Sequence, residues 1–212
     1  MLRKWPRAAF SVVLGAGLCF SQEPTVIRVW TYNVVRLTDD VLAQSQQEAA
    51  AVLREAGVET SWVTCALSTE EASENPACLT PWCPTDLQMI LTDQEMMLPR
   101  KIPKGVLGLS SPDSDHARIV CDRVRLVAAN RGIPLPSLLG RMMAHEVGHL
   151  LLGSTKHQLS GIMRGTWGDW ELNAGTQRLR FRTGEAAALR RNAAERALSS
   201  RSCRAGLPSS AR

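Results

Sequence analysis

The sequence predicts an α+β domain with a mixed β-sheet, one buried central helix and a closing C-terminal helix. Three observations support this class. Short segments rich in β-branched and aromatic residues recur between residues 25 and 127, as expected of strands. One amphipathic helical pattern lies among them, and a strongly apolar helical stretch follows and ends at Gly153. A last helical pattern begins at Thr183, with Glu185 in its first turn.

The N-terminal segment, residues 1–21, is typical of a secretory signal peptide. Its basic start contains Arg3, Lys4 and Arg7. An apolar run from Ala8 to Phe20 follows, and this run is too short to span a bilayer. The segment therefore predicts export of the protein.

We expect cleavage near Ser21, which would give a secreted or periplasmic protein. Retention of the segment as a membrane anchor is an alternative. A lipoprotein site at Cys19 is disfavoured, because the bulky Leu18 stands where a small residue is required. The 212-residue chain has room for one ordinary domain, expected over residues 22–200, and a disordered basic tail, expected over residues 201–212. We find no internal repeat or linker and expect a monomer.

The charge balance gives no indication of a nucleic-acid partner. The chain holds 25 basic and 20 acidic residues, a net charge of +5. The predicted signal peptide contains three basic and no acidic residues, so the mature chain would be near +2. The remaining arginines are concentrated toward the C-terminus, which is typical of a solvated face. We therefore expect no nucleic-acid partner, and no membrane association after signal cleavage.

Five of the six cysteines would remain after cleavage, and in an exported protein they can form disulfides. Cys65, Cys78 and Cys83 flank one polar loop, so we expect a bridge within this trio, without deciding which pair forms it. The other two are Cys121 and Cys203. No pair has the Cys-x-x-Cys spacing of a metal site.

Strand and helix signals follow one another along the chain. The first helix follows Thr38, where Asp39 and Asp40 place acidic charge at its positive end, and it ends at Gly57. A polar loop is expected over residues 68–85. The segments expected to form strands are residues 25–35, 59–67, 86–92, 105–110 and 119–127. Pro134 and Pro136 then mark the entry to the apolar helix, with Ser137 as its expected cap.

The apolar helix carries a His-Glu-x-x-His motif. His145 and His149 are four residues apart and share one helix face, so both imidazoles can bind a single metal ion. Glu146 follows the first histidine, and its carboxylate can reach a zinc-activated water as a general base. The alternative is a buried structural helix whose histidines are satisfied by hydrogen bonds. Residues farther along the chain favour the metal site.

Those residues are His157 and the segment Gly161-Ile162-Met163. With them, the motif resembles the extended histidine motif and Met-turn of the metzincin superfamily of zinc peptidases. The spacing differs from the usual one, because Gly153 comes one residue late and His157 two residues late. The expected order of strands and helices over residues 25–165 also resembles that family.

The resemblance implies that Zn²⁺ is bound by His145, His149 and His157, with Glu146 as general base and Met163 in a turn below the metal. Together with the predicted signal peptide, it implies a secreted zinc metalloendopeptidase that hydrolyses peptide bonds in peptide or protein substrates. An extended substrate could add as a strand beside residues 105–110 if these form a sheet edge. No tyrosine follows Met163, since the chain's single tyrosine is Tyr32.

Two rival interpretations remain open. Glu171 or Glu185 could supply the third ligand, as in zinc peptidases that use a glutamate from a later helix. Alternatively, the protein could be a secreted binding module that has lost activity, although the intact Glu146 argues against this. His116 is expected to face solvent, and Asp113 with Asp115 is weak evidence for calcium.

Overall fold

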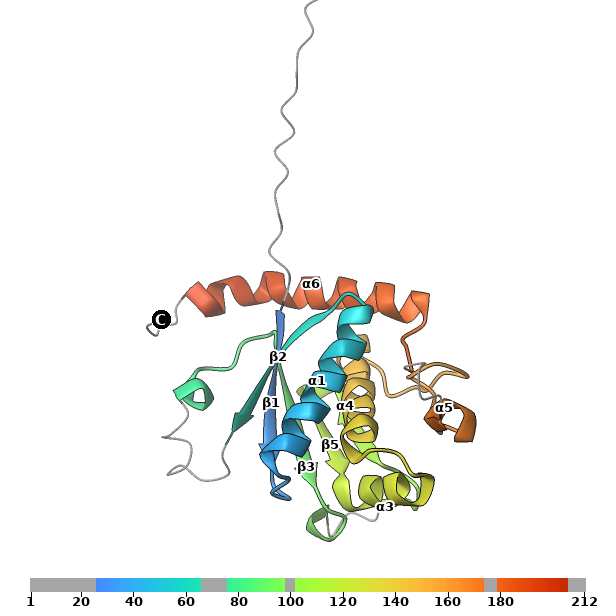
Figure 1. Ribbon diagram of the computed structural model, residues 1–212. Helices are drawn as coiled ribbons and strands as arrows, with labels where there is room; N and C mark the ends of the chain where they lie inside the picture. The colour runs from blue at the N-terminus through green and yellow to red at the C-terminus, as the bar shows by residue number, and fades with distance from the viewer. Residues whose placement is uncertain (1–25, 66–75, 98–101, 174–178, 206–212) are drawn as a thin grey trace, which may run out of the picture.

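The chain folds into a five-stranded sheet with two helices, α1 and α4, on one face and a third, α6, along one end (Figure 1). The computed structural model describes residues 26–65, 76–97, 102–173 and 179–205. The predicted signal peptide lies outside these residues. The arrangement confirms the predicted α+β class with a mixed sheet.

The sheet has the strand order β2-β1-β3-β5-β4. The strands are β1 (Val26–Asn33), β2 (Glu59–Cys65), β3 (Asp86–Thr92), β4 (Gly108–Ser111) and β5 (His116–Val120). The first three pairings are parallel, and β4 pairs with β5 in the antiparallel direction. Strand β4 is therefore an edge strand, as the substrate-strand hypothesis requires.

The core lies on the face of the sheet where apolar side chains from alternate strand positions meet the helices. Ile27 and Val29 of β1, and Leu87, Met89 and Leu91 of β3, are fully buried in one cluster with apolar side chains of α1 and α4. Residues two apart in a strand point to the same face of the sheet, so this set marks the face that the helices cover.

Helix α4 (Leu135–Leu152) is the central element of the fold. Each residue from Leu138 to Leu151 is buried, because the sheet, α1 (Asp39–Glu55) and α3 (Cys121–Arg131) pack around this helix. A polar contact also joins α4 to α1, since Arg141 Nε lies 3.5 Å from Glu48 Oε1. The helix begins at Leu135, so Ser137 is inside it and is not its cap. Gly153, at a φ of 62°, ends it as predicted.

The predicted strand over residues 119–127 is wrong for most of its length. Strand β5 ends at Val120, and α3 begins at Cys121. Apolar residues in this segment alternate, but Cys121, Val124 and Ala128 also have the spacing of one helical face, and all three are buried. The helical packing against α4 and the left-handed Gly132 at the C-terminus of α3 decide between the two patterns.

Helix α6 (Thr183–Ala205) begins at Thr183 as predicted and crosses one end of the molecule. It extends into the stretch 201–212 for which a tail is expected, and residues 206–212 lie outside the described residues. Arg190 of α6 donates a hydrogen bond to the carbonyl oxygen of Ala56 at 2.9 Å. The remaining helical segments are η1 (Pro76–Leu79), η2 (Glu95–Met97), η3 (Pro112–Ser114) and α5 (Asp169–Asn173).

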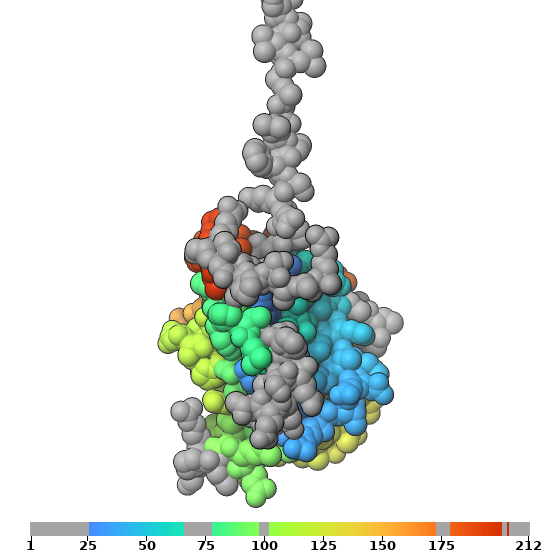
Figure 2. Space-filling view, turned by 90° about the vertical axis from the view of Figure 1, so that its left-hand side faces the viewer, coloured from blue at the N-terminus to red at the C-terminus, as the bar shows by residue number. Residues whose placement is uncertain are grey.

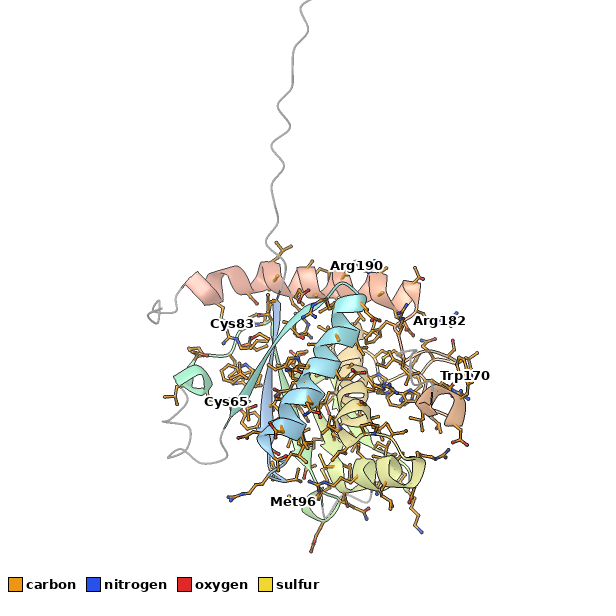
Figure 3. All side chains as sticks on the ribbon, in the orientation of Figure 1. Cys65, Cys83, Met96, Trp170, Arg182 and Arg190 are labelled. Carbon is orange, nitrogen blue, oxygen red and sulfur yellow. A yellow bond between two sulfur atoms is a disulfide. The ribbon has the colours of Figure 1, made fainter. Side chains whose placement is uncertain are left out.

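Two disulfides join the sheet to its surroundings. Cys65 pairs with Cys78, which confirms a bridge within the predicted trio. Cys83 pairs with Cys203 and so fastens α6 to the segment that leads into β3. Figure 3 labels Cys65 and Cys83 on the left-hand side of the molecule. Figure 2 shows the red end of α6 above the green segment that begins at residue 76. Cys121 is a buried free thiol, and burial raises its pKa to about 12.

Within the described part of the chain, no helix combines the length and the apolar character needed to cross a membrane.

Candidate metal centre

The two histidines of the His-Glu-x-x-His motif have fixed orientations. Nδ1 of His145 lies 2.7 Å from the carbonyl oxygen of Ile162, and Nδ1 of His149 lies 2.7 Å from that of Ser154. A carbonyl oxygen only accepts hydrogen bonds, so each Nδ1 carries the proton and donates it. In the neutral rings, each Nε2 then carries a lone pair. This is the tautomer that binds a metal through Nε2.

The two Nε2 atoms face each other at 3.0 Å. Burial is the main cause that lowers the pKa of His145 to about 4, and it also lowers the pKa of His149, so both rings are neutral near pH 7. Two facing lone pairs repel each other, and a cation bound to both nitrogens is the arrangement that satisfies them. The geometry of the motif is therefore compatible with a metal site.

His157 completes a cluster of three imidazoles. After Gly153 ends α4, the chain turns back and brings the His157 ring centroid to 4.9 Å from that of His149 and 5.3 Å from that of His145. The three potential ligand nitrogens all lie within 4.8 Å of one another. Two of these rings are buried and that of His157 is exposed, so the cluster is open to solvent on one side.

Hydrogen bonds shape the loop that carries His157. The amide of Gln158 donates to the carbonyl oxygen of Met163 at 2.9 Å, and the amide of Ile162 donates to that of Arg180 at 2.9 Å. The carbonyl oxygen of Ile162 accepts from His145 and also from the indole nitrogen of Trp167, at 3.1 Å. The carbonyl group of Ile162 thus connects α4 and the loop that contains Trp167 to the turn at Gly161-Ile162-Met163.

Met163, the predicted Met-turn residue, is fully buried against α4. Its sulfur and the ring of Phe181 both lie beside Gly148, the residue that precedes His149. The turn at Gly161-Ile162-Met163 therefore packs directly against the helix that carries the first two histidines.

Glu146 belongs to α4, and its side chain points toward the edge strand β4. Its side chain is almost fully buried, accepts a hydrogen bond from Ser110 Oγ, and lies so close to Gly108 that a side chain there would overlap the carboxylate. Burial raises the pKa of Glu146 to about 7, although the hydrogen bond from Ser110 opposes the rise. A carboxyl group with such a pKa can both accept and return a proton at neutral pH.

The two glutamates considered as rival ligands make other contacts. Glu171 pairs with Arg164 and accepts a hydrogen bond from the amide of Gly168 at 2.9 Å. Glu185 accepts one from the amide of Arg182 at 2.6 Å, as an acid in the first turn of α6 does when it caps the helix. Among the described residues, the group that could hold a metal is formed by the three histidines.

A cleft of about 770 Å³ contains the histidine cluster. One wall comes from residues 104–107 and β4, the floor from α4 and α3, and the far side from the loop after Met163. Among the side chains lining it are His145, Glu146, His149, His157, Leu107, Val127, Leu138, Met142, Trp167 and Leu172. The cleft is thus a mainly apolar groove that passes the histidines, and Tyr32 does not line it.

The remaining polar candidates do not form a metal site with one another. Asp115 pairs with Arg196 of α6. His116 is half-buried rather than fully solvent-exposed, and its Nδ1 lies 2.7 Å from Ser114 Oγ. The calcium hypothesis for Asp113 and Asp115 therefore gains no support within the described residues.

Two residues of the centre were not singled out from the sequence. Ser110 contacts Glu146 from a separate strand, and nothing in its local sequence distinguishes it from neighbouring serines. Trp167 lies edge-on to His145, with ring centroids 5.8 Å apart. A signal for Trp167 does exist, because binding residues are concentrated on loops and Trp167 lies in a glycine-rich loop just after the motif.

Comparisons with known proteins find relatives by structure only. No protein-family model and no curated protein matches the chain by sequence. A crystal structure of a zinc-dependent peptidase from Methanocorpusculum labreanum is similar with a TM-score of 0.51 and 15% identity, over 76% of this chain and 99% of that one. The archaemetzincin of Methanopyrus kandleri gives a TM-score of 0.48 at 12% identity, over 81% and 98%.

The archaemetzincin of Archaeoglobus fulgidus, solved as a malonate complex, gives a TM-score of 0.44 at 15% identity, over 76% of this chain and 99% of that chain. The chain spans nearly the whole length of each of these structures. At such low identity, the likeness to the Methanocorpusculum labreanum protein establishes a shared fold and nothing finer.

Proposed function

We propose that this protein is a zinc-dependent peptidase of metzincin type. The observation that carries the proposal is the 3.0 Å separation of the Nε2 atoms of His145 and His149, whose Nδ1 atoms are both engaged by backbone carbonyl oxygens. The fold shared with a protein described as a zinc-dependent peptidase supports it. His157 and Glu146 line the same cleft as His145 and His149, which also supports the proposal.

The donor set fits zinc. Three imidazole nitrogens leave a fourth position of a tetrahedral ion open, which is the ligand set of several catalytic zinc sites. The carbonyl oxygens of Ile162 and Ser154 hold His145 and His149 in the metal-binding tautomer. When bound, zinc would lower the pKa of a coordinated water and polarise the substrate carbonyl group.

Glu146 would move the proton. Its Oε2 accepts a hydrogen bond from the hydroxyl group of Ser110, while Oε1 lies against the backbone of Gly108. In the proposed reaction the carboxylate takes a proton from the attacking water and then delivers it to the leaving amine nitrogen. The raised pKa of Glu146 supports both halves of this transfer, because neither protonation state is strongly disfavoured near pH 7.

The substrate would bind as an extended strand beside β4. Strand β4 is at the sheet edge, and Gly108 to Ser110 line the cleft next to Glu146. A peptide added at this edge makes backbone hydrogen bonds, and its alternate side chains enter the apolar groove. This arrangement would bring a peptide bond past the histidines.

Metal analysis combined with a peptide-cleavage assay tests the proposal. The purified protein should contain about one zinc per chain, as expected of a single catalytic site. It should cleave some members of a random pool of internally quenched peptides. Removal of zinc by a chelator should stop cleavage, and added zinc should restore it. Bound zinc without cleavage of any peptide would favour the binding-module alternative, and absence of zinc would refute the zinc-peptidase proposal.

We also propose that the protein is exported. The pairs Cys65–Cys78 and Cys83–Cys203 support an oxidising compartment, where such bridges persist. N-terminal sequencing of the exported protein should begin near Gln22. A sequence beginning at Met1 in a membrane fraction would indicate a retained anchor instead.

A further inference from the structure

One wall of the cleft is formed by a segment without regular structure of its own. This wall segment, residues 102–107, has no helix or strand, and residues 104–107 line the cleft directly. Backbone carbonyl groups in such a segment need hydrogen-bond donors from elsewhere. The position of the wall therefore depends on whichever group supplies them.

For three of these carbonyl groups, those of Ile102, Pro103 and Val106, that group is the side chain of Arg123 on α3. Its Nη1 donates to the carbonyl oxygens of Pro103 and Val106, at 2.7 Å each, and its Nη2 donates to that of Ile102 at 3.2 Å. Its Nε donates to Gln94 Oε1 at 3.0 Å. One guanidinium group thus ties α3 to the wall segment and to the turn after β3. The planar fork of donors suits arginine, and the single nitrogen of lysine cannot reproduce it.

The N-terminus of α3, which carries Arg123, is itself held in place. The amide of Asp122 donates to Asp93 Oδ1 at 3.0 Å, and the amide of Gln94 donates to Asp122 Oδ1 at 3.2 Å. These two reciprocal hydrogen bonds join the start of α3 to the turn after β3. Arg123 therefore extends from a fixed base, and its half-buried side chain connects the turn after β3 to the wall segment.

The wall segment leads directly into the edge strand. The carbonyl oxygen of Leu107 accepts from the amide of Val120 at 2.8 Å, and β4 begins at the next residue, Gly108. A shift of the wall would consequently change how the wall meets the start of β4, while the pairing of Gly108 to Ser111 with β5 keeps Ser110 beside Glu146. The three histidines lie on α4 and the loop after it, so such a shift would leave them in place.

We propose that Arg123 is a positioning residue that holds the wall segment, where it meets the start of β4, in the geometry that binds an extended peptide. The proposal rests on the proposed peptidase function for its substrate. It assigns Arg123 to substrate binding and not to metal binding or proton transfer. Its loss should therefore raise KM and leave kcat and zinc content nearly unchanged.

The test compares Arg123→Ala and Arg123→Lys with Arg125→Ala as the matched control. Arg125 is on the same helix and ion-pairs with Asp93 at 3.7 Å, and no hydrogen bond links it to the wall segment. Each variant is measured for zinc content, for hydrogen exchange of the backbone amides of residues 104–110, and for kcat and KM on a peptide that the unmodified protein cleaves.

For Arg123→Ala we expect wall amides to exchange about tenfold faster or more, and KM to rise by about tenfold or more with kcat within about twofold. Arg123→Lys should show smaller increases in exchange rate and KM, because lysine keeps the positive charge but lacks the planar set of guanidinium donors. Arg125→Ala should match the unmodified protein. Unchanged exchange and KM in Arg123→Ala would overturn the proposal, as would equal effects in Arg125→Ala.

The two proposals fail in different ways. If the unmodified protein cleaves no peptide, the peptidase function is wrong, and hydrogen exchange still decides whether Arg123 holds the wall. If the unmodified protein cleaves peptides but Arg123→Ala loses zinc, Arg123 supports the metal centre and the assignment to substrate binding is wrong. If Arg123→Ala does not fold, Arg123→Lys decides the matter by the same measurements.

Discussion

The sulfur atom of Met163 lies 2.7 Å from the point that a Cβ atom at Gly148 would occupy. The Phe181 ring lies at the same distance from this point. The absence of a side chain at residue 148 therefore lets the turn after His157 and the segment before α6 pack against the ligand helix. This contact packs the turn at Gly161-Ile162-Met163 against the helix that carries His145 and His149.

Replacement of Gly148 should destabilise the protein. In Gly148→Ala the new methyl group would overlap Met163 and Phe181, and such overpacking costs about 1–3 kcal/mol in the free energy of unfolding. Alanine's better helix propensity would offset about 1 kcal/mol of this loss. Chemical denaturation measures the effect. The control is Gly184→Ala in α6, where nothing lies within 4 Å of the new Cβ. Equal stability of the two variants would contradict the packing argument.

Glu146→Gln should keep zinc and lose hydrolysis. The amide fills the same space beside Ser110 but cannot accept the proton of the attacking water. We expect kcat to fall by about a hundredfold to ten-thousandfold, the usual contribution of a general base. Metal analysis should find the zinc content of the unmodified protein. Peptide cleavage at a near-normal rate would show that another group acts as the base.

The third ligand can be identified by metal affinity. His157→Ala should weaken zinc binding by more than about a hundredfold, since loss of a direct ligand exceeds the effect of an outer-shell change. Glu171→Gln and Glu185→Gln should leave the metal in place, because these carboxylates contact Arg164 and the amide of Arg182. Competition with a zinc-binding dye measures the affinity. Zinc loss in a glutamate variant with retention in His157→Ala would move the protein to the glutamate-ligand class.

The two disulfides should differ in their effect on stability. Cys83 and Cys203 are 120 residues apart, whereas Cys65 and Cys78 are 13 residues apart. A bridge that closes a longer loop restricts the unfolded chain more, and the chain-entropy relation gives a difference of about 2 kcal/mol. Denaturation of Cys83→Ser/Cys203→Ser and Cys65→Ser/Cys78→Ser double variants measures it. A smaller loss from the Cys83–Cys203 pair would show that the loop relation does not hold in this protein.

The sequence by itself determined the features that depend on residues close together in the chain. The spacing of His145 and His149 places them on one helix face, and the apolar residues around them predict the burial that the structure has. Gly153 and Thr183 mark helix ends for local steric and capping reasons, and both ends agree with the structure. The strands β1 and β3 also agree with the segments expected from the sequence, since β-branched and aromatic residues favour strands.

Only the tertiary structure decided the features that join distant segments. The sequence left three candidate third ligands, and chain reversal after Gly153 brings His157 rather than Glu171 or Glu185 into the cluster. The helical form of residues 121–131 depends on packing against α4, because the local pattern also allows a strand. The contacts of Arg123 with residues 102–106 and of Ser110 with Glu146 join separate elements. No local spacing predicts such contacts, because the fold sets which segments meet.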